Sequence, residues 1–385
     1  MTRIRGAWMD HPGTRAVFRA LENGGYQALF VGGCVRDALL DRPVGDIDIA
    51  TDARPEIVTE LAESSDIKVV PTGIAHGTVT LVAKGRGHEV TTFRRDVETD
   101  GRHAVVQFSD AVGEDAARRD FTMNALYATA TGEVIDPLEG LPDLHARRVR
   151  FVGDPVARIT EDALRSLRFF RFHAWYGDPQ AGMDSDALSA IAATADTVAN
   201  LSRERIGQEM RKLLNAPDPA PAVAVMAISG VLGHVLPGAE DRALAPLVHL
   251  EGGRPPDPMR RLAALGGTDP VADLRLSKAE SKALATLREG VQNAMSPEEL
   301  GYRFGAEQGE NILLLRGAML ETPTCADDFA AVRRGAVATF PVKPGDLMPQ
   351  YSGAALGVRM RELEARWIAS GFALTRAALC AEGDG

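Results

Sequence analysis

Residues 32–37 read Gly-Gly-Cys-Val-Arg-Asp, and residues 46–48 read Asp-Ile-Asp. The apolar run at 28–31 predicts a strand that leads into the two glycines, and residues 35–40 predict a helix after them. In an extended segment, residues two apart project from the same face, so we expect Asp46 and Asp48 to point together while Ile47 and Ile49 face the core. The sequence therefore predicts a strand–turn–helix–strand unit that presents two carboxylates side by side.

Two neighbouring carboxylates repel each other unless a cation lies between them. Hard oxygen ligands suit Mg²⁺, which keeps coordination positions open for phosphate oxygens. Backbone N–H groups at a helix start can receive a phosphate. A glycine pair alone is usually a tight turn, and Asp-x-Asp alone is usually a surface pair. Their combination in this order predicts metal-assisted phosphoryl or nucleotidyl transfer.

Length and composition limit the remaining possibilities. A chain of 385 residues with 45% hydrophobic residues can bury a sizeable core in two to four domains. No apolar run approaches the roughly 20 residues that span a bilayer, and residues 1–13 do not resemble a signal peptide. Cys34, Cys325 and Cys380 are few and far apart, which favours a reducing cytoplasm over disulfides or a zinc site.

The formal net charge of -10 carries no simple nucleic-acid signature. The basic residues are nevertheless unevenly spread, and one group predicts the start of a basic track for RNA. Its members are Arg147, Arg148, Arg150, Arg158, Arg165, Arg168 and Arg171.

The chain changes character along its length. Up to about residue 140, strands are expected at 28–31, 46–50, 68–71, 77–83 and 88–93. From residue 162 onward, helical periods rich in Ala, Leu and Arg take over, and Pro and Gly cluster at 216–221, 252–258 and 341–349. The fold class expected is α+β, with a mixed α/β head followed by three helical pieces.

A second motif, residues 118–126, reads Arg-Arg-Asp-Phe-Thr-Met-Asn-Ala-Leu. Asp120 is expected to cap a helix that follows it, with Phe121 and Leu126 packed inward. One interpretation is an ordinary capped helix with surface arginines. The other places Arg119 against nucleotide phosphates, where its forked guanidinium is useful.

A third motif, residues 161–171, reads Glu-Asp-Ala-Leu-Arg-Ser-Leu-Arg-Phe-Phe-Arg. Asp162, Arg165, Arg168 and Arg171 recur every three residues, which predicts a stripe along a helix or simply a solvated charged face. Cytosine and adenine both show an amino donor beside a ring-nitrogen acceptor. Asp162 can accept a hydrogen bond from the amino group, and Arg165 can donate one to the ring nitrogen. Uracil and guanine present the wrong polarity there, so this pair could select C and A without a template.

In this order, the three motifs resemble the class II nucleotidyltransferases of the polymerase-β-like superfamily, which include tRNA CCA-adding enzymes and bacterial poly(A) polymerases. The segments 149–155 and 202–206 add to the resemblance, which is strong from about residue 30 to 214. It implies a polymerase-β-like nucleotidyltransferase head followed by an all-helical neck, body and tail. The boundaries expected are 1–140 for the catalytic head, 141–215 for the base-selecting neck, 216–340 for the RNA-binding body and 341–385 for a tRNA-binding tail.

The resemblance also implies roles for particular residues. Asp46 and Asp48 are the implied catalytic ligands of a two-metal Mg²⁺ site. Glu89 is our candidate for a third carboxylate ligand, with an exposed strand glutamate as the alternative. The implied nucleotide-binding residues are Gly33, Arg36, Arg119, Asp162, Arg165, Arg168 and Arg171.

Residues 72–78, Thr-Gly-Ile-Ala-His-Gly-Thr, resemble the CCA-adding branch, and residues 94–108 resemble the flexible head loop of the family. The implied activity is template-independent addition of C, C and A to the tRNA 3′ end from CTP and ATP, with release of pyrophosphate, in the cytoplasm. A bacterial poly(A) polymerase, C-only or A-only addition, and a catalytically silent RNA-binding protein remain alternatives. Monomer and homodimer are both open. His234 and His249 lack an adjoining Asp, so no metal-dependent phosphohydrolase activity is expected.

Overall fold

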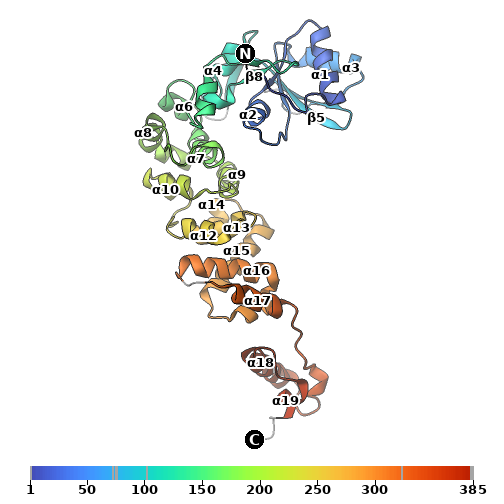
Figure 1. The fold of residues 1–385 in the computed structure, drawn as a ribbon, viewed down its shortest axis with the longest axis vertical. Helices are drawn as coiled ribbons and strands as arrows, with labels where there is room; N and C mark the ends of the chain where they lie inside the picture. The colour runs from blue at the N-terminus through green and yellow to red at the C-terminus, as the bar shows by residue number, and fades with distance from the viewer. Residues whose placement is uncertain (1, 72, 74–76, 101–102, 322–323, 382–385) are drawn as a thin grey trace. The chain divides into compact units, whose positions relative to one another are not determined.

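The computed structural model describes residues 2–71, 73, 77–100, 103–321 and 324–381 (Figure 1). The chain divides into two compact units, residues 1–235 and residues 236–385. The first unit contains all the strands of the described residues, and the second consists of helices and connections. The α+β class predicted from the sequence is confirmed.

The elements of the first unit follow in chain order. They are α1 (Pro12–Asn23), β1 (Ala28–Val31), α2 (Gly33–Leu39), β2 (Asp48–Thr51), α3 (Pro55–Ser64), β3 (Lys68–Val70), β4 (Thr78–Ala83), β5 (Arg86–Thr92), β6 (Arg94–Asp100), β7 (His103–Phe108), α4 (Val112–Ala117), the 3₁₀ helix η2 (Thr122–Asn124), β8 (Tyr127–Ala128), β9 (Val134–Ile135), α5 (Gly140–His145), α6 (Pro155–Glu161), α7 (Leu164–Tyr176), α8 (Ser185–Ala193), the 3₁₀ helix η3 (Ala195–Asn200), α9 (Arg203–Leu214), α10 (Ala220–Ile228) and α11 (Val231–Val235).

All the elements of the second unit within its described residues are helices. Its elements are α12 (Leu244–Glu251), α13 (Pro258–Leu265), α14 (Pro270–Asp273), α15 (Lys278–Gln292), α16 (Pro297–Met319), α17 (Ala326–Ala336), the 3₁₀ helix η4 (Pro344–Asp346), α18 (Gly353–Ala369) and α19 (Arg376–Ala381). Across the described parts of both units, no helix has the length and apolar character needed to cross a bilayer.

Within the described residues, the main sheet has the order β3-β4-β5-β2-β1-β8-β9. The central pair β2 and β5 is parallel, whereas the other strand pairs of this sheet are antiparallel. β6 and β7 form a separate two-stranded hairpin in the segment expected as a head loop. The strand predicted at 46–50 begins only at Asp48, because residue 46 lies in a bend.

The two faces of the sheet have different neighbours. Phe30 of β1 packs against Phe18 of α1, with ring centroids 4.3 Å apart, and Ile49 lies opposite Phe30 in the neighbouring strand. Ile47 and Ile49 are both buried, as predicted. In Figure 1, α1 and α3 lie together on one side of the sheet. Asp48, next to Ile49, therefore faces the opposite side.

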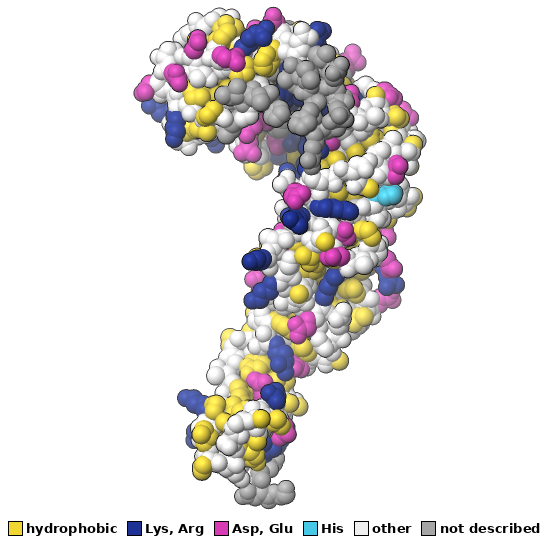
Figure 2. Space-filling model, turned by 180° about the vertical axis from the view of Figure 1, so that it is seen from behind, with side chains coloured by type: hydrophobic (Ala, Val, Ile, Leu, Met, Phe, Trp, Pro, Cys, Tyr) yellow, Lys and Arg dark blue, Asp and Glu magenta, His cyan; other side chains and the backbone are white. Residues whose placement is uncertain are grey.

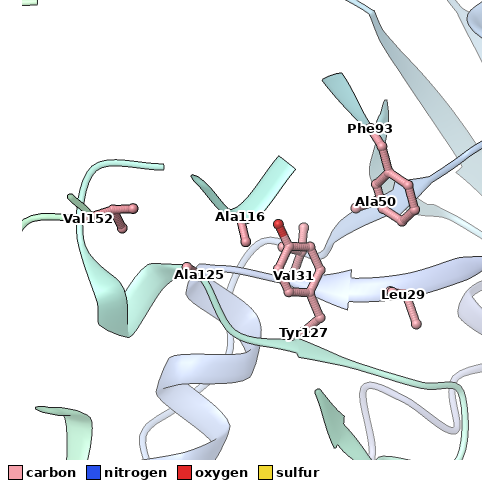
Figure 3. Close-up of a cluster of buried hydrophobic side chains, with 8 residues drawn as sticks. All are labelled: Leu29, Val31, Ala50, Phe93, Ala116, Ala125, Tyr127 and Val152. Carbon is pink, nitrogen blue, oxygen red and sulfur yellow. The ribbon is translucent and has the colours of Figure 1, made fainter. Parts of the chain in front are cut away.

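An apolar cluster supports the side of the sheet that Asp48 faces (Figure 3). In Figure 3 the Val31 and Tyr127 side chains lie near each other beside the strand, with Ala116 close by. Burial of these side chains fixes β1, β2 and the segment after α4 to one another. The members are Leu29, Val31, Ala50, Phe93, Ala116, Ala125, Tyr127 and Val152.

Aromatic packing joins helix α7 to the segment between α4 and β8. Phe121 contacts Phe151, Phe169 and Phe172, with ring centroids 5.0 to 6.3 Å apart. Since Phe169 and Phe172 belong to α7, this packing fixes α7 beside the segment that carries Arg119 and Asp120.

Candidate functional site

A sharp glycine turn connects β1 to α2. Gly32 has φ +70°, a left-handed conformation that side chains rarely adopt, and a Cβ there would lie 3.2 Å from Nη1 of Arg119. The Gly32 N–H donates to the carbonyl of Leu126, 3.1 Å away. Gly32 thus allows Arg119 to approach the backbone closely, and Gly33 begins the short helix that was predicted.

Three carboxylates gather beside this turn. Asp48, the first residue of β2, pairs in parallel register with Glu89 of β5, and Asp46 lies exposed in the preceding bend. Burial raises the pKa of Asp48 to about 6, and repulsion from Glu89 and, more weakly, from Asp46 adds to the rise, whereas Arg119 opposes it. The other predicted carboxylate, Asp46, the candidate third carboxylate, Glu89, and Arg119 are therefore all close enough to Asp48 to shift its pKa.

The donor set fits a hard divalent cation. All three side chains offer oxygen ligands, and the repulsion that raises the pKa of Asp48 is relieved by positive charge between them. Within the described residues, no three metal-binding side chains stand close enough together to enclose an ion. Side-chain rotation would have to complete the site, and Asp46 is exposed enough to rotate.

Hydrogen bonds to Tyr127 and Asp115 hold the Arg119 guanidinium in place. Its Nε donates to the Tyr127 hydroxyl at 3.0 Å, its Nη2 donates to Asp115 Oδ2 at 3.0 Å, and Tyr127 donates to that same oxygen at 2.6 Å. Burial alone would lower the pKa of Arg119, but the interactions with Tyr127 and Asp115 raise it above its ordinary value. Arg119 is a fixed, permanent positive charge next to Gly32.

Asp120 does not cap a helix, so that prediction is wrong. Only the 3₁₀ helix η2 follows it, because the chain must enter β8 at Tyr127 and has no length for an α-helix. The Asp120 carboxylate instead accepts from Nδ2 of Asn124 at 2.9 Å and from Nε of Arg168 at 2.7 Å. Arg168 and the other contacts lower the pKa of Asp120 although burial opposes them.

Arg36 is bound on several sides by protein groups. Its guanidinium donates to Asp37 at 2.9 Å, to Asn124 Oδ1 at 2.7 Å and to the Tyr176 hydroxyl at 2.7 Å. It also lies over the Tyr176 ring, 3.9 Å from the centroid. Arg36 therefore links α2 to α7, and its predicted contact with a nucleotide remains a prediction.

The helical stripe predicted from Asp162 to Arg171 is wrong at its first member. Asp162 has φ −153° and ψ 104°, between α6 and α7, and its Oδ1 accepts from the N–H of Leu164 at 3.1 Å. Aspartate favours such capping geometry over a helix interior because its carboxylate competes for backbone N–H groups.

The proposed base-reading pair has protein partners in this structure. Oδ2 of Asp162 accepts from Nη2 of Arg205 at 2.7 Å. Arg165 forms an ion pair with Glu161 and donates to the carbonyl of Arg158 at 2.9 Å. Nη2 of Arg165 also donates to the carbonyl of Arg118 at 3.4 Å.

The predicted basic track from 147 to 171 is largely ion-paired. Figure 2 shows basic side chains interspersed with acidic ones along the helical segments of the face drawn. The four carboxylates neutralise part of the charge of the six arginines that they contact, so this segment offers less positive potential than its sequence suggests. The pairs are Arg148 and Arg150 with Asp143, Arg158 and Arg165 with Glu161, Arg168 with Asp120, and Arg171 with Glu209.

Several residues of this site had no role in the sequence-based prediction. Asp115 and Tyr127 hold Arg119, and Asn124 joins Asp120 to Arg36. Arg205 pairs with Asp162. Two of these residues carried a signal in the sequence: Asn124 lies four residues after Asp120 in the second motif, and Arg205 lies in the segment 202–206. Thr72, Ile74, Ala75 and His76 of the branch motif lie outside the described residues.

Comparisons with known proteins show which proteins the chain is similar to. Residues 28–150 match the family model of the Poly A polymerase head domain, and residues 182–242 match that of the probable RNA and SrmB-binding site of polymerase A. A CCA-adding enzyme of Geobacillus thermodenitrificans is 43% identical over 228 residues, which are 59% of this chain and 54% of that protein. One of Bacillus pumilus is 43% identical over 238 residues, 60% of this chain and 57% of its own.

The chain thus spans little more than half the length of these curated relatives. A crystal structure of the Bacillus stearothermophilus CCA-adding enzyme with CTP superposes with a TM-score of 0.72 at 28% identity and covers 92% of this chain and 91% of that one. On these matches and the order of its motifs, residues 28–150 form a head domain of the poly(A) polymerase type, and the chain is similar to CCA-adding enzymes.

Proposed function

We propose that this chain adds C, C and A to the 3′ end of tRNA from CTP and ATP, without a template and with release of pyrophosphate. The observation that carries the proposal is the pairing of Asp48 with Glu89 beside the Gly32 turn, where the charge of Arg119 acts on Asp48. The similarity to CCA-adding enzymes supports this activity over others of the family.

The carboxylates Asp46 and Asp48, with Glu89 as the third, would hold divalent cations, for which we propose Mg²⁺. When bound, the ions activate the attacking 3′-hydroxyl and neutralise the pyrophosphate leaving group. Asp48 must lose its proton to act as a ligand, which its pKa of about 6 permits at neutral pH. Arg119, charged and fixed, would orient the triphosphate on the side of Gly32.

Base selection is assigned to Asp162 and Arg165. Each would exchange a protein partner for the base, Arg205 in the case of Asp162 and Glu161 in the case of Arg165. A base with the wrong polarity cannot replace these ion pairs, so the exchange itself discriminates against uracil and guanine. Gly33, Arg36, Arg168 and Arg171 remain proposed neighbours of the nucleotide, as the family resemblance implies.

One assay separates this proposal from its alternatives. Purified protein is incubated with Mg²⁺ and tRNA that lacks its 3′ CCA, with CTP and ATP singly and together, and the products are sequenced. Addition of CCA is expected. A long run of A indicates a poly(A) polymerase, and addition of C alone or A alone indicates a partial enzyme. No addition while the tRNA still binds indicates a catalytically silent RNA-binding protein and overturns the proposal.

Partner and compartment follow from the same proposal. tRNA, CTP and ATP are the proposed partners, and the cytoplasm is the proposed compartment, where Cys34, Cys325 and Cys380 would remain the free thiols they are here. The division into head, neck, body and tail at residues 140, 215 and 340 also stays a proposal.

A further inference from the structure

A cavity of about 370 Å³ lies beside the carboxylates, on the side of the sheet away from α1 and α3. Asp46 and Glu89 line it, together with Thr80, Arg86, Gly45 and Gly87. Its volume falls within the roughly 300–1,000 Å³ of typical ligand pockets. We call it the β4–β5 cavity, because most of these residues belong to β4, β5 and their connecting turn.

The cavity is separate from the group of residues proposed to hold the nucleotide. Gly32, Arg36 and Arg119 do not line it, although Asp46 and Glu89 do. Arg119 lies near Gly32 and acts on Asp48, whereas Arg86 lines the cavity together with Asp46 and Glu89. In-line displacement at phosphorus places the attacking and leaving oxygens on opposite sides. If the triphosphate lies with Arg119, the attacking hydroxyl enters from the cavity.

Charge and shape both suit the end of an RNA chain. The phosphodiesters of an acceptor would be repelled by three carboxylates, and Arg86 is the basic residue that lines the cavity. No hydrogen bond or ion pair joins its guanidinium to the residues that the structure describes, so its forked donors are available to phosphate oxygens.

Two glycines keep the cavity open. A Cβ at Gly45 or Gly87 would meet no heavy atom within 4 Å, and neither residue has a positive φ. The backbone therefore does not require glycine at these positions. Gly87 lies two residues from Glu89 in β5, so a side chain there would project on the same face as Glu89.

We propose that the β4–β5 cavity holds the 3′-terminal ribose and phosphodiester of the acceptor RNA, and that Arg86 binds its phosphate as a positioning residue. This inference rests on the proposed nucleotidyl transfer. It adds the place of the acceptor and a residue that selects it.

The test compares Arg86→Ala, Arg86→Lys and the control Lys84→Asn by the initial rate of C addition. Lys84 sits two residues away in the hairpin turn at φ +50°, which Asn tolerates, and it does not line the cavity. Arg86→Ala is expected to raise the KM for tRNA about tenfold, as for loss of a charged hydrogen bond. The KM for CTP and the binding of CTP without RNA should stay unchanged, and Arg86→Lys should restore part of the effect.

A second variant, Gly87→Leu, fills the cavity without removing any charge. It is expected to weaken binding of fluorescently labelled tRNA about tenfold or more, as loss of a phosphate contact would, while CTP binding measured by calorimetry is retained. A raised KM for CTP instead, or an equal effect of Lys84→Asn, would overturn the assignment of the cavity.

Failure of the proposed function gives a different result. Wild-type protein that adds no nucleotide overturns the function, whereas normal addition with an unchanged KM for tRNA in Arg86→Ala overturns only the cavity assignment. In an inactive wild type, fluorescence anisotropy of 3′-labelled tRNA still decides the cavity: weaker binding by Arg86→Ala supports it, and equal binding refutes it.

Discussion

Asp48 and Glu89 stand directly beside each other on the parallel strands β2 and β5. The repulsion between them is part of what raises the pKa of Asp48 to about 6, after the larger effect of burial. Because like charges repel, this concentration of negative charge destabilises the metal-free folded protein and favours the binding of a cation. Stability and metal affinity should therefore respond in opposite directions when this charge is removed.

Asp48→Asn is expected to stabilise the metal-free protein at neutral pH. The pKa of Asp48 is higher in the folded protein than its usual 3.8, so the folded state holds the proton more tightly, and stability falls as the pH rises from about 4 to about 6. At pH 7.5 the variant should gain about 1–2 kcal/mol, after allowance for solvent screening. Urea unfolding in EDTA at pH 5.0 and 7.5 measures this gain.

The gain should shrink at pH 5.0, where wild-type Asp48 is mostly protonated. Asp46→Asn is the matched control, because Asp46 is exposed and should change the stability less. Equal stabilities of wild type and Asp48→Asn at both pH values would contradict the assigned pKa. Both variants should lose nucleotide transfer while they keep tRNA binding.

Glu89→Gln is expected to weaken the binding of Mg²⁺ without abolishing the fold. The amide keeps the shape of the side chain but removes a negative ligand, so the half-saturating Mg²⁺ concentration for C addition should rise about tenfold. The rate at saturating Mg²⁺ should recover in part. Glu60→Gln, an exposed glutamate of α3, is the control. An unchanged Mg²⁺ dependence would remove Glu89 from the proposed metal site.

Asp162→Ala is expected to reduce discrimination between CTP and UTP. Loss of the acceptor for the cytosine amino group should lower the ratio of their kcat/KM values about tenfold or more. Arg205→Ala should lower the ratio less, because it only frees the Asp162 carboxylate, and Arg205→Lys should restore part of it. Lys212→Ala, on the exposed side of α9, serves as the control. Discrimination equal to wild type in Asp162→Ala would refute base reading by this residue.

Tyr176→Phe tests whether Arg36 acts as a structural link. The change removes the hydroxyl that accepts a hydrogen bond from Arg36 but keeps the ring under the guanidinium. Stability should fall by about 1–2 kcal/mol in urea unfolding, with the KM for CTP nearly unchanged. Tyr26→Phe, on the connection between α1 and β1, is the control. A large rise in the KM for CTP without loss of stability would instead show that Tyr176 orients Arg36 toward the nucleotide.

Much of the sheet was predictable from the sequence. The five strands expected before residue 94 occur within two residues of their predicted ends, because alternating or continuous apolar residues mark a sheet with covered faces. β8 and β9 have two residues each, too few for a periodic pattern, and they were not predicted. Asp162 was misplaced because a period of three cannot reveal that the residue lies between α6 and α7 and that its carboxylate accepts from the N–H of Leu164.

The sequence by itself determined the glycine turn, the alternation that turns Ile47 inward and Asp48 outward, and the motifs that resemble the family, because each depends on residues close together in the chain. Only the tertiary structure decided which partner each charged side chain takes. Arg36 meets Tyr176 across 140 residues, and Arg205 meets Asp162 across 43. Such pairs depend on how α2, α7 and α9 pack, and the spacing of residues along the chain does not predict that packing.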